Sequence, residues 1–269
     1  MPRFPLPPDR MPAATAGPPP RLRKAWRYAG IFGEELMACA GIVRVGPARQ
    51  AFWAVWDRRE GVLRERTRLL PRRQVALPDG RVVVRDDDVE VDLRLDPAGE
   101  PVATTSAHRG APIWTRKAPV RAVGTVRIGG RARPVDAPGL EDHSAGWHAR
   151  HTAWRWAAGA GADEAGRALV WNLVDGIHDA PSGSERRVWV DGVPREVGPV
   201  TFDRLLAGVA FAEGGALAFR AEAVRARRDE LGLVASDYEQ PFGSFSGVLP
   251  GDLAVAGGRG VMERHRARW

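Results

Sequence analysis

The chain has one cysteine, two lysines and no long apolar run, and each scarcity narrows what the protein can be. With Cys39 alone no disulfide can form within the chain, which favours a reducing compartment such as the cytoplasm. Cys39 lies in the strand-like run "ELMACAGIV", so we expect a buried, unreactive thiol. No segment approaches the roughly 18 apolar residues that cross a membrane, and the first 20 residues lack the apolar core of a secretory signal. We therefore predict a cytoplasmic protein without a transmembrane segment.

The positive charge of the chain is carried almost entirely by arginine. The formal net charge is +7, and Lys24 and Lys117 are the only lysines. The arginines are scattered, and even the densest groups, "RARR" (225–228) and "RHRAR" (264–268), alternate with apolar or acidic neighbours as solvated strand faces do. Nucleic-acid binding requires clustered cations that neutralise phosphates. The pattern therefore argues against a nucleic-acid partner.

The sequence also lacks the common cofactor and metal motifs. No Walker motif, CxxC pair or HExxH sequence occurs, and "GAGADEAG" lacks the full GxGxxG pattern of dinucleotide-binding proteins. "GSFSG" (243–247) is not a nucleophile elbow, because Phe245 occupies the position that serine must hold. We therefore expect no cofactor.

Short alternating segments separated by turn signals recur along the chain, which is typical of an all-β protein. Gly129-Gly130 and Asp191-Gly192 follow such segments and are suited to tight hairpin turns. The clearest stretch with a helical period is the short segment "DRLLAGVAF" (203–211). The sequence thus predicts very little helix. The strand candidates are "AFWAVW" (51–56), "VVVR" (82–85), "VEVDLRL" (89–95), "VRAVGTVRI" (120–128), "RRVWV" (186–190), "ALAFRAEAV" (216–224), "FGSFSGVL" (242–249) and "GVMERHRARW" (260–269).

The domain organisation follows from breaks in the strand pattern. Residues 1–21 are rich in proline and are predicted to be a flexible tail. The segment "RARPVDAPGLEDH" (131–143) interrupts the pattern, so we divide the rest into an N-terminal β half (22–138) and a C-terminal β half (139–269). The strand count fits two antiparallel sandwich-like or barrel-like halves packed as one unit. The oligomeric state is left open.

The segment "EDHSAGWHARHTAWRWAAGAG" (141–161) concentrates histidine, tryptophan and acidic residues. Residues 151–158 alternate as a strand, with Trp154 and Trp156 on one face and His151 and Arg155 on the other. The run "RALVWNLVD" (167–175) is a plausible antiparallel partner, and both strands carry bulky residues on both faces. We predict a central hairpin that is covered on both sides.

Three interpretations of this segment are open, two functional and one structural. His143, His148 and His151, with Glu141 or Asp142, supply atoms for a metal site, although strand geometry places His148 and His151 on opposite faces. Alternatively, Asp142 and His143 are the polar end of an aromatic pocket that is walled by Trp147, Trp154 and Trp156. The third possibility is that the tryptophans simply fill the core of a sheet.

Several motifs resemble the bacterial domain of unknown function 2804 (DUF2804) family. They are "DHSAGWHARHTAWRWAAGAG" (142–161), "WNLVDG" (171–176), "SERRVWVDG" (184–192), "LGLVASDYEQPFGSFSGVL" (231–249) and "MERHRARW" (262–269). With upstream matches the likeness covers roughly residues 22–269. Arg186 stands where the family pattern has asparagine, which puts any role of that amide in doubt. The family is similar in architecture to carotenoid 1,2-hydratase and AttH-like proteins, which implies two lipocalin-like β units around an apolar ligand cleft. The positions that match the pattern are Asp142, Gly146, Thr152, Trp154, Trp156, Asn172, Glu185, Trp189, Gln240 and Gly243.

Residue chemistry and resemblance together predict a cleft that binds a hydrophobic or lipid-like molecule. Acid–base chemistry of the hydratase, isomerase or lyase type would fall to Asp142, His143 and Glu185. A non-catalytic carrier and a histidine-based metal protein are the alternatives, and whether the protein is an enzyme is left open. The predicted ligand-binding residues are Trp147, His151, Trp154, Trp156, Asn172, Trp189 and Gln240.

Overall fold

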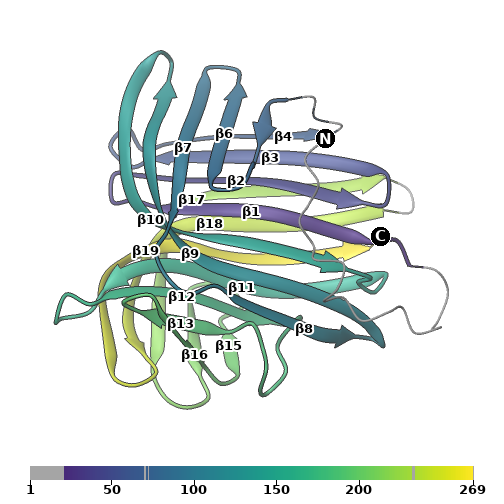
Figure 1. Cartoon of the computed structure of the whole chain (residues 1–269), viewed down its shortest axis with the longest axis vertical. Helices are drawn as coiled ribbons and strands as arrows, with labels where there is room; N and C mark the ends of the chain where they lie inside the picture. Colours follow the sequence, from purple (N-terminus) through teal and green to yellow (C-terminus); the bar gives the residue numbers. More distant parts are fainter. Residues whose placement is uncertain (1–20, 70, 72, 232–233, 269) are drawn as a thin grey trace.

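The computed structural model describes residues 21–69, 71, 73–231 and 234–268, and within these ranges the chain contains strands and no helix (Figure 1). The all-β prediction is confirmed. The proline-rich segment 1–20 lies outside the described residues. Arg21, predicted as the end of that tail, donates hydrogen bonds to the carbonyls of His108 and Arg109.

The strands form two antiparallel sheets. The ten-stranded sheet has the order β4-β3-β2-β1-β10-β9-β7-β6-β5, with β8 also paired to β9, and the nine-stranded sheet has the order β14-β13-β12-β11-β19-β18-β17-β16-β15. The strands of the first sheet are β1 (Lys24–Phe32), β2 (Leu36–Val45), β3 (Ala48–Asp57), β4 (Val62–Leu69), β5 (Val75–Ala76), β6 (Arg81–Asp86), β7 (Val89–Pro97), β8 (Val102–His108), β9 (Ala111–Ile128) and β10 (Arg131–Gly146). Those of the second are β11 (His151–Ala162), β12 (Ala168–Asp175), β13 (Arg187–Val190), β14 (Val193–Glu196), β15 (Val200–Phe202), β16 (Gly208–Phe211), β17 (Ala216–Leu231), β18 (Val234–Leu249) and β19 (Leu253–Arg268).

The two predicted hairpin turns are confirmed. Gly129 and Gly130 have φ values of 55° and 80°, and they join β9 to β10, where Ile128 pairs with Arg131. Asp191 and Gly192, at 47° and 80°, join β13 to β14 in the same way. Positive φ at both central residues is the geometry that matches strand twist in a two-residue hairpin.

The change from one sheet to the other occurs in the connection between β10 and β11, residues 147–150. The predicted boundary at 138/139 therefore falls inside β10, which runs unbroken from Arg131 to Gly146. Pro134 and Pro138 suggested a break, but β10 continues through both of them and keeps its register with β9 throughout.

The stretch 203–211 has a helical period but is not a helix. The Asp203 carboxylate accepts hydrogen bonds from the backbone N–H groups of Leu205 and Ala207, and Leu206 takes a left-handed φ of 58°. This capped turn leads directly into β16, and Leu206, Val209 and Phe211 are buried. The apolar spacing thus reflects a turn followed by alternation in a strand.

Three apolar clusters stabilise the molecule. One, which includes Trp53 and Leu93, is built from the first sheet alone, and a second, which includes Trp171 and Phe245, from the second sheet alone. The third joins residues of both sheets, among them Tyr28 and Trp156, where the long strands of the two sheets lie against one another (Figure 1). Trp156 and Trp171, from the predicted central hairpin β11–β12, belong to different clusters, so this hairpin is covered on both faces as predicted.

An ion-pair ladder links β4, at the edge of the first sheet, to the turn between β6 and β7. Arg64, Arg66 and Arg68 pair with Asp88, Asp87 and Asp86, and the shortest Arg68–Asp86 distance is 2.5 Å. Asp86 also accepts a hydrogen bond from the Trp53 indole at 2.9 Å. These side chains connect two ends of the sheet that share no backbone pairing.

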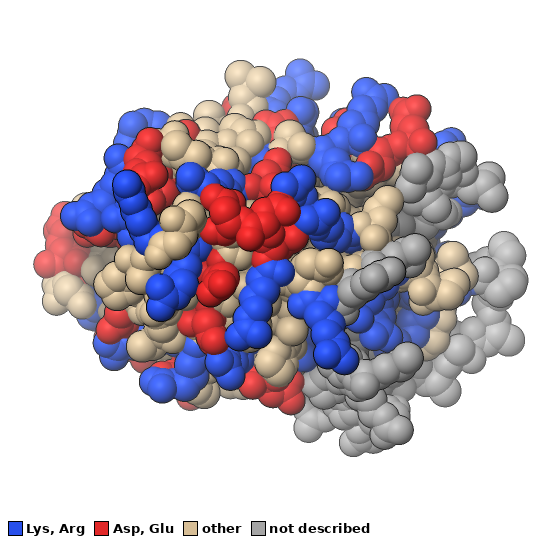
Figure 2. Space-filling view, turned by 90° about the horizontal axis from the view of Figure 1, so that it is seen from above, with Lys and Arg blue, Asp and Glu red and all other residues tan. Residues whose placement is uncertain are grey.

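The surface carries mixed charge, with acidic and basic side chains interspersed over the face shown in Figure 2. Within the described part of the chain, no helix has the length and apolarity needed to cross a membrane. Cys39 is buried as predicted, and burial raises the pKa of its thiol to about 12.

Candidate functional site

A cavity of about 500 Å³ lies between the two sheets. Strand alternation places one face of β1, β2, β3, β9 and β10 on one side and one face of β11, β17, β18 and β19 on the other. The residues that border it are Leu22, Trp26, Arg27, Tyr28, Val43, Val45, Pro47, Ala48, Arg49, Gln50, Phe52, Leu69, Lys117, Asp142, Trp154, Trp156, Val174, Ile177, His178, Glu185, Arg225, Arg227, Asp229, Ser236, Tyr238, Glu263 and His265.

Aromatic rings form much of the cavity wall. The rings of Trp26 and Trp154 are nearly parallel, with an angle of 11° and centroids 6.2 Å apart. Tyr28 meets Trp156 edge to face at 5.5 Å. Trp26 and Trp154 remain partly exposed, whereas Tyr28 and Trp156 are buried. The wall therefore offers apolar, polarisable surface to a ligand.

A buried lysine holds two carboxylates at one end of the cavity. Lys117 and Asp142 pair across the β9–β10 ladder, and their Nζ and Oδ1 atoms are 2.6 Å apart. The same Nζ lies 3.3 Å from Oε1 of Glu185. Burial raises the pKa of Asp142, and the Lys117 ammonium opposes this effect, while the two carboxylates keep the pKa of Lys117 above its usual value. With both carboxylates ionised, the group carries one positive and two negative charges, a net charge of −1.

Glu263 is a second, separate carboxyl group in the cavity. The Trp154 indole donates a hydrogen bond to Oε1 at 2.8 Å, and the Gln240 amide donates one to Oε2 at 3.1 Å. Burial raises the pKa of Glu263 to about 7, although Trp154, Tyr238 and Arg225 all favour its charged form. The Asp142 carboxylate contributes to the increase, so the two acids influence one another electrostatically.

Arg225 lies inside the protein near Glu263. Its Nε is 2.8 Å from Oε2 of Glu65, and its Nη2 donates a hydrogen bond to the Thr67 hydroxyl at 3.0 Å. The guanidinium also lies over the rings of Phe52 and Tyr238, at 4.2 and 4.8 Å from their centroids. This arrangement ties β17 of the second sheet to β4 of the first.

Two histidines, the buried His178 and the partly exposed His265, complete the polar part of the wall. His178 Nδ1 is 2.8 Å from the Ser106 hydroxyl, and His265 Nε2 is 2.8 Å from the Ser236 hydroxyl. Burial lowers the pKa of each imidazole to about 3. Both rings are therefore neutral at physiological pH.

The structure brings together part of the site that the sequence predicted. Asp142, Glu185, Trp154 and Trp156 border the cavity. Asn172 lies behind it, where its amide accepts a hydrogen bond from the Trp156 indole at 2.8 Å and donates one to the Glu185 carbonyl at 3.0 Å. It therefore helps to position two residues of the wall, as Gln240 does for Glu263.

The other predicted site residues lie elsewhere. His143 follows Asp142 on β10, so alternation turns it to the opposite face, where its Nε2 accepts a hydrogen bond from Arg27. Trp147 lies in the connection between the sheets, and His151 is exposed at the start of β11. Trp189 is fully buried in the shared apolar cluster, with its indole bonded to the Glu100 carbonyl at 2.8 Å.

The histidine metal site that the sequence left open as an alternative does not form among these residues. His143 and His151 are on β10 and β11, while His148 packs against the Trp26 ring at 4.8 Å. Across the described ranges of the chain, no group of three or more histidine, cysteine, aspartate or glutamate side chains is arranged to hold a metal ion.

The site residues predicted from the sequence do not include four that border the cavity: Lys117, Glu263, Tyr28 and Tyr238. One signal was available: basic residues number 40, of which only two are lysines, and both Lys24 and Lys117 are buried. A residue type that is nearly absent from the surface is informative where it does occur. Likewise the only two tyrosines of the chain, Tyr28 and Tyr238, both border the cavity.

Arg186, the departure from the family pattern, has a structural role here. It is 1% exposed, and its guanidinium donates hydrogen bonds to the carbonyls of Asp179, Ala180 and Val197. These bonds fix the loop between β12 and β13, which carries His178 and Glu185 to the cavity.

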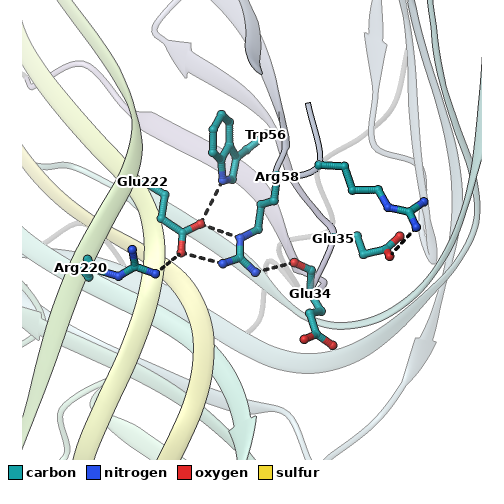
Figure 3. A pocket seen from close by; sticks show the side chains of 7 residues that line it. Glu34, Glu35, Trp56, Arg58, Arg220 and Glu222 are labelled. Atoms are coloured by element: carbon teal, nitrogen blue, oxygen red, sulfur yellow. Dashed lines mark hydrogen bonds and ion pairs between the residues drawn. The ribbon is translucent and has the colours of Figure 1, made fainter. Parts of the chain in front are cut away.

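A second, open depression of about 390 Å³ is polar (Figure 3). Arg58 binds both oxygens of Glu222, at 2.6 and 2.8 Å, and the Trp56 indole donates to the same carboxylate at 3.2 Å. Its central charged groups are thus paired with one another, and the contacts link the end of β3 to β17. This depression is better explained as a tie between the sheets than as a ligand site.

Comparison with known proteins extends the description of the fold. The sequence profile of the family described as domain of unknown function (DUF2804) matches residues 81–269, more than half of the chain. The structure is similar to a protein of Nitrosomonas europaea described as a candidate AttH (TM-score 0.58, 14% identity, 91% of this chain and 92% of that chain). It is also similar to kievitone hydratase from Nectria haematococca (TM-score 0.55, 10% identity, 90% and 88%). No curated protein sequence matches the chain significantly. The expected family and the AttH-like architecture are confirmed.

Proposed function

We propose that this chain, which belongs to the DUF2804 family, binds a hydrophobic small molecule between its two sheets and acts on it by cofactor-independent acid–base chemistry. The observation that carries the proposal is Glu263, a buried carboxyl group on the wall of a largely aromatic cavity. Its pKa of about 7 means that acid and carboxylate are both populated at neutral pH. Such a group can donate and accept a proton under physiological conditions.

The second acid of the cavity is suited to the complementary role. Lys117 lies 2.6 Å from Asp142 and favours its carboxylate form. Two carboxyl groups whose surroundings differ in this way are a common arrangement for an acid–base pair. In a hydration, protonated Glu263 gives its proton to the ligand, Asp142 takes a proton from the attacking water, and solvent returns that proton to Glu263.

The fold comparison identifies neither the reaction nor the substrate. Kievitone hydratase shares the architecture at 10% identity, which is a likeness of fold alone. The support for acid–base chemistry therefore comes from Glu263, Asp142 and the aromatic wall of this chain. Hydration, its reverse, and double-bond isomerisation all require the same two proton transfers.

The test begins with the ligand that the protein carries. The full chain is purified from its own host, and native mass spectrometry identifies any bound molecule. The extracted molecule is then incubated with protein in water labelled with oxygen-18. We expect uptake of label, or a shifted double bond, with the wild type and not with Glu263→Gln.

Glu239→Gln is the matched control. Glu239 lies on β18, next to β19, and its carboxylate pairs with Arg264 instead of facing the cavity. This variant should react like the wild type. A bound molecule that all proteins leave chemically unchanged would make the protein a carrier, and a cavity that takes up no apolar molecule would contradict the proposal altogether.

A further inference from the structure

The charged side chains that face the cavity, counted together with their ion-pair partners, leave a negative excess. We propose that the molecule bound there is a cation, namely an apolar amine or quaternary ammonium compound. This inference rests on the proposed function and specifies its ligand class. It excludes fatty acids and other apolar anions, which are common ligands of apolar cavities.

The excess originates at the lysine end of the cavity. Lys117 pairs with two carboxylates, Asp142 and Glu185, so this group carries a net charge of −1 when both are ionised. Asp142 is the most accessible of the three, with 12% of its side chain exposed against 3% for Lys117 and 5% for Glu185. A cationic ligand would therefore meet the Asp142 carboxylate first.

The arginines on the cavity face do not compensate for this excess. Arg225 is paired with Glu65 at 2.8 Å, and Arg227 binds both oxygens of Asp229 at 2.6 and 2.8 Å. Each of these pairs is neutral. Glu263 then adds a charge between 0 and −1, because its pKa is about 7.

The remaining titratable residues at the cavity add no positive charge to it. Arg27 and Arg49 border it, but strand alternation turns their side chains to the other face of the sheet, where Arg27 pairs with Asp79 at 3.1 Å. His178 and His265 are neutral, since their pKa values are about 3. Counted with Glu65, which pairs with Arg225 from outside the cavity wall, these groups thus sum to −1 to −2 when the carboxylates of Asp142 and Glu185 are ionised, inside a protein whose formal net charge is +7.

The aromatic wall is also suited to a cation. The faces of tryptophan and tyrosine rings attract ammonium and guanidinium groups. The protein shows this on its own wall, where the Arg225 guanidinium lies over Phe52 and Tyr238. Trp26 and Trp154 are partly exposed to the cavity, and the Trp154 indole donates to Glu263, which makes that ring a better partner for positive charge.

Three probes of similar shape and different charge test the inference: benzyltrimethylammonium (+1), neopentylbenzene (0) and phenylmethanesulfonate (−1). Binding to the wild-type chain is measured at pH 7 by the change in tryptophan fluorescence. We expect the cation to bind at least about tenfold more tightly than its neutral isostere, and the anion to bind most weakly. Equal or weaker binding of the cation would overturn the inference, while binding of the neutral probe alone would leave the proposed function intact.

Two variants test whether the preference for the cationic probe arises in this cavity. Asp142→Asn should reduce the ratio of cation to neutral affinity about tenfold. Val174→Ala, which shortens an apolar side chain of the wall, should weaken all probes alike and leave that ratio unchanged. A preference that survives Asp142→Asn unchanged would place the cation elsewhere and contradict the inference.

The pH dependence gives a second readout that does not depend on whether Asp142→Asn folds. Between pH 6 and pH 8 the wild-type preference for the cation should increase, because Glu263 loses its proton, while binding of neopentylbenzene stays constant. The increase should be absent in Glu263→Gln. A preference that is flat with pH in the wild type would contradict the assignment of the negative excess to this cavity. If no probe binds, the proposed function fails together with the inference.

Discussion

Replacement of Lys117 by methionine is the most direct perturbation of the charged end of the cavity. Methionine fills a similar volume but leaves Asp142 and Glu185 buried without their cation. At an effective dielectric constant of 20, a pair of charges at 2.6 or 3.3 Å attracts with about 5–6 kcal/mol, and the cost of desolvating the charges offsets much of this. Removal of one partner from a buried pair typically costs about 3–5 kcal/mol. We expect a loss of that size at neutral pH.

Arg121→Met is the matched control for this experiment. Arg121 lies on β9, four residues after Lys117, and binds both oxygens of Asp136 at 2.5 and 2.6 Å. Its contacts are as short as those of Lys117, but the side chains of Arg121 and Asp136 are 63% and 53% exposed. An exposed pair of this kind contributes little to stability, because water and salt screen it. The comparison thus isolates the effect of burial at similar geometry.

Urea denaturation at pH 5 and pH 8 measures both variants. In Lys117→Met the pKa of Asp142 is raised by burial with no ammonium to oppose it, so the folded variant binds a proton more readily than the unfolded chain. Its stability should therefore fall as pH rises, and the deficit relative to wild type should be larger at pH 8 than at pH 5. Equal losses in Lys117→Met and Arg121→Met, or a deficit that shrinks toward pH 8, would refute the reasoning.

Three further predictions concern other parts of the fold. Because the folded-state pKa of Glu263 is about 7 against 4.5 for a free glutamate, the wild type should lose on the order of 3 kcal/mol relative to Glu263→Gln between pH 4 and pH 8, measured by denaturation across that range. Arg68→Ala should lower the melting temperature clearly, since it removes two hydrogen bonds from Asp86, whose side chain is only 3% exposed; a decrease no larger than that of Arg121→Met would contradict the role of the ladder. Tyr28→Phe should change the melting temperature little, because the buried Tyr28 hydroxyl interacts with the Cys39 thiol, which is a weak hydrogen-bonding group; a clear decrease would show that the hydroxyl is structurally needed.

The sequence predicted the fold better than it predicted the site, and particular residues show why. Alternation of residue types reports the two faces of a strand, so β11 and its partner β12 could be read directly from "HTAWRW" and "RALVWNLVD". Alternation does not report which strand lies across a face. Trp154 meets Glu263 only because β11 pairs with β19, at a sequence separation of 109 residues. No local pattern contains that information.

The predicted polar pair Asp142–His143 is divided for a different, local reason. Neighbours in sequence point to opposite faces of a strand, and here the segment predicted as irregular is the end of the long strand β10. Asp142 therefore faces the cavity with Lys117, while His143 faces Arg27 on the other side. An irregular segment could have brought both side chains to one cleft, whereas a strand separates them.

The position of the site explains why its charged groups need both sheets. Lys117 and Asp142 are held by adjacent strands of the first sheet, and Glu263 and Gln240 by adjacent strands of the second. Asp142 nevertheless raises the pKa of Glu263, which means that the proton affinity of one sheet's acid depends on a charge in the other. A change in the spacing of the sheets would therefore alter this pKa even if every residue of the cavity were retained. Arg225, which pairs with Glu65 of the first sheet while it lies close to Glu263 in the second, ties that spacing to the electrostatics of the site.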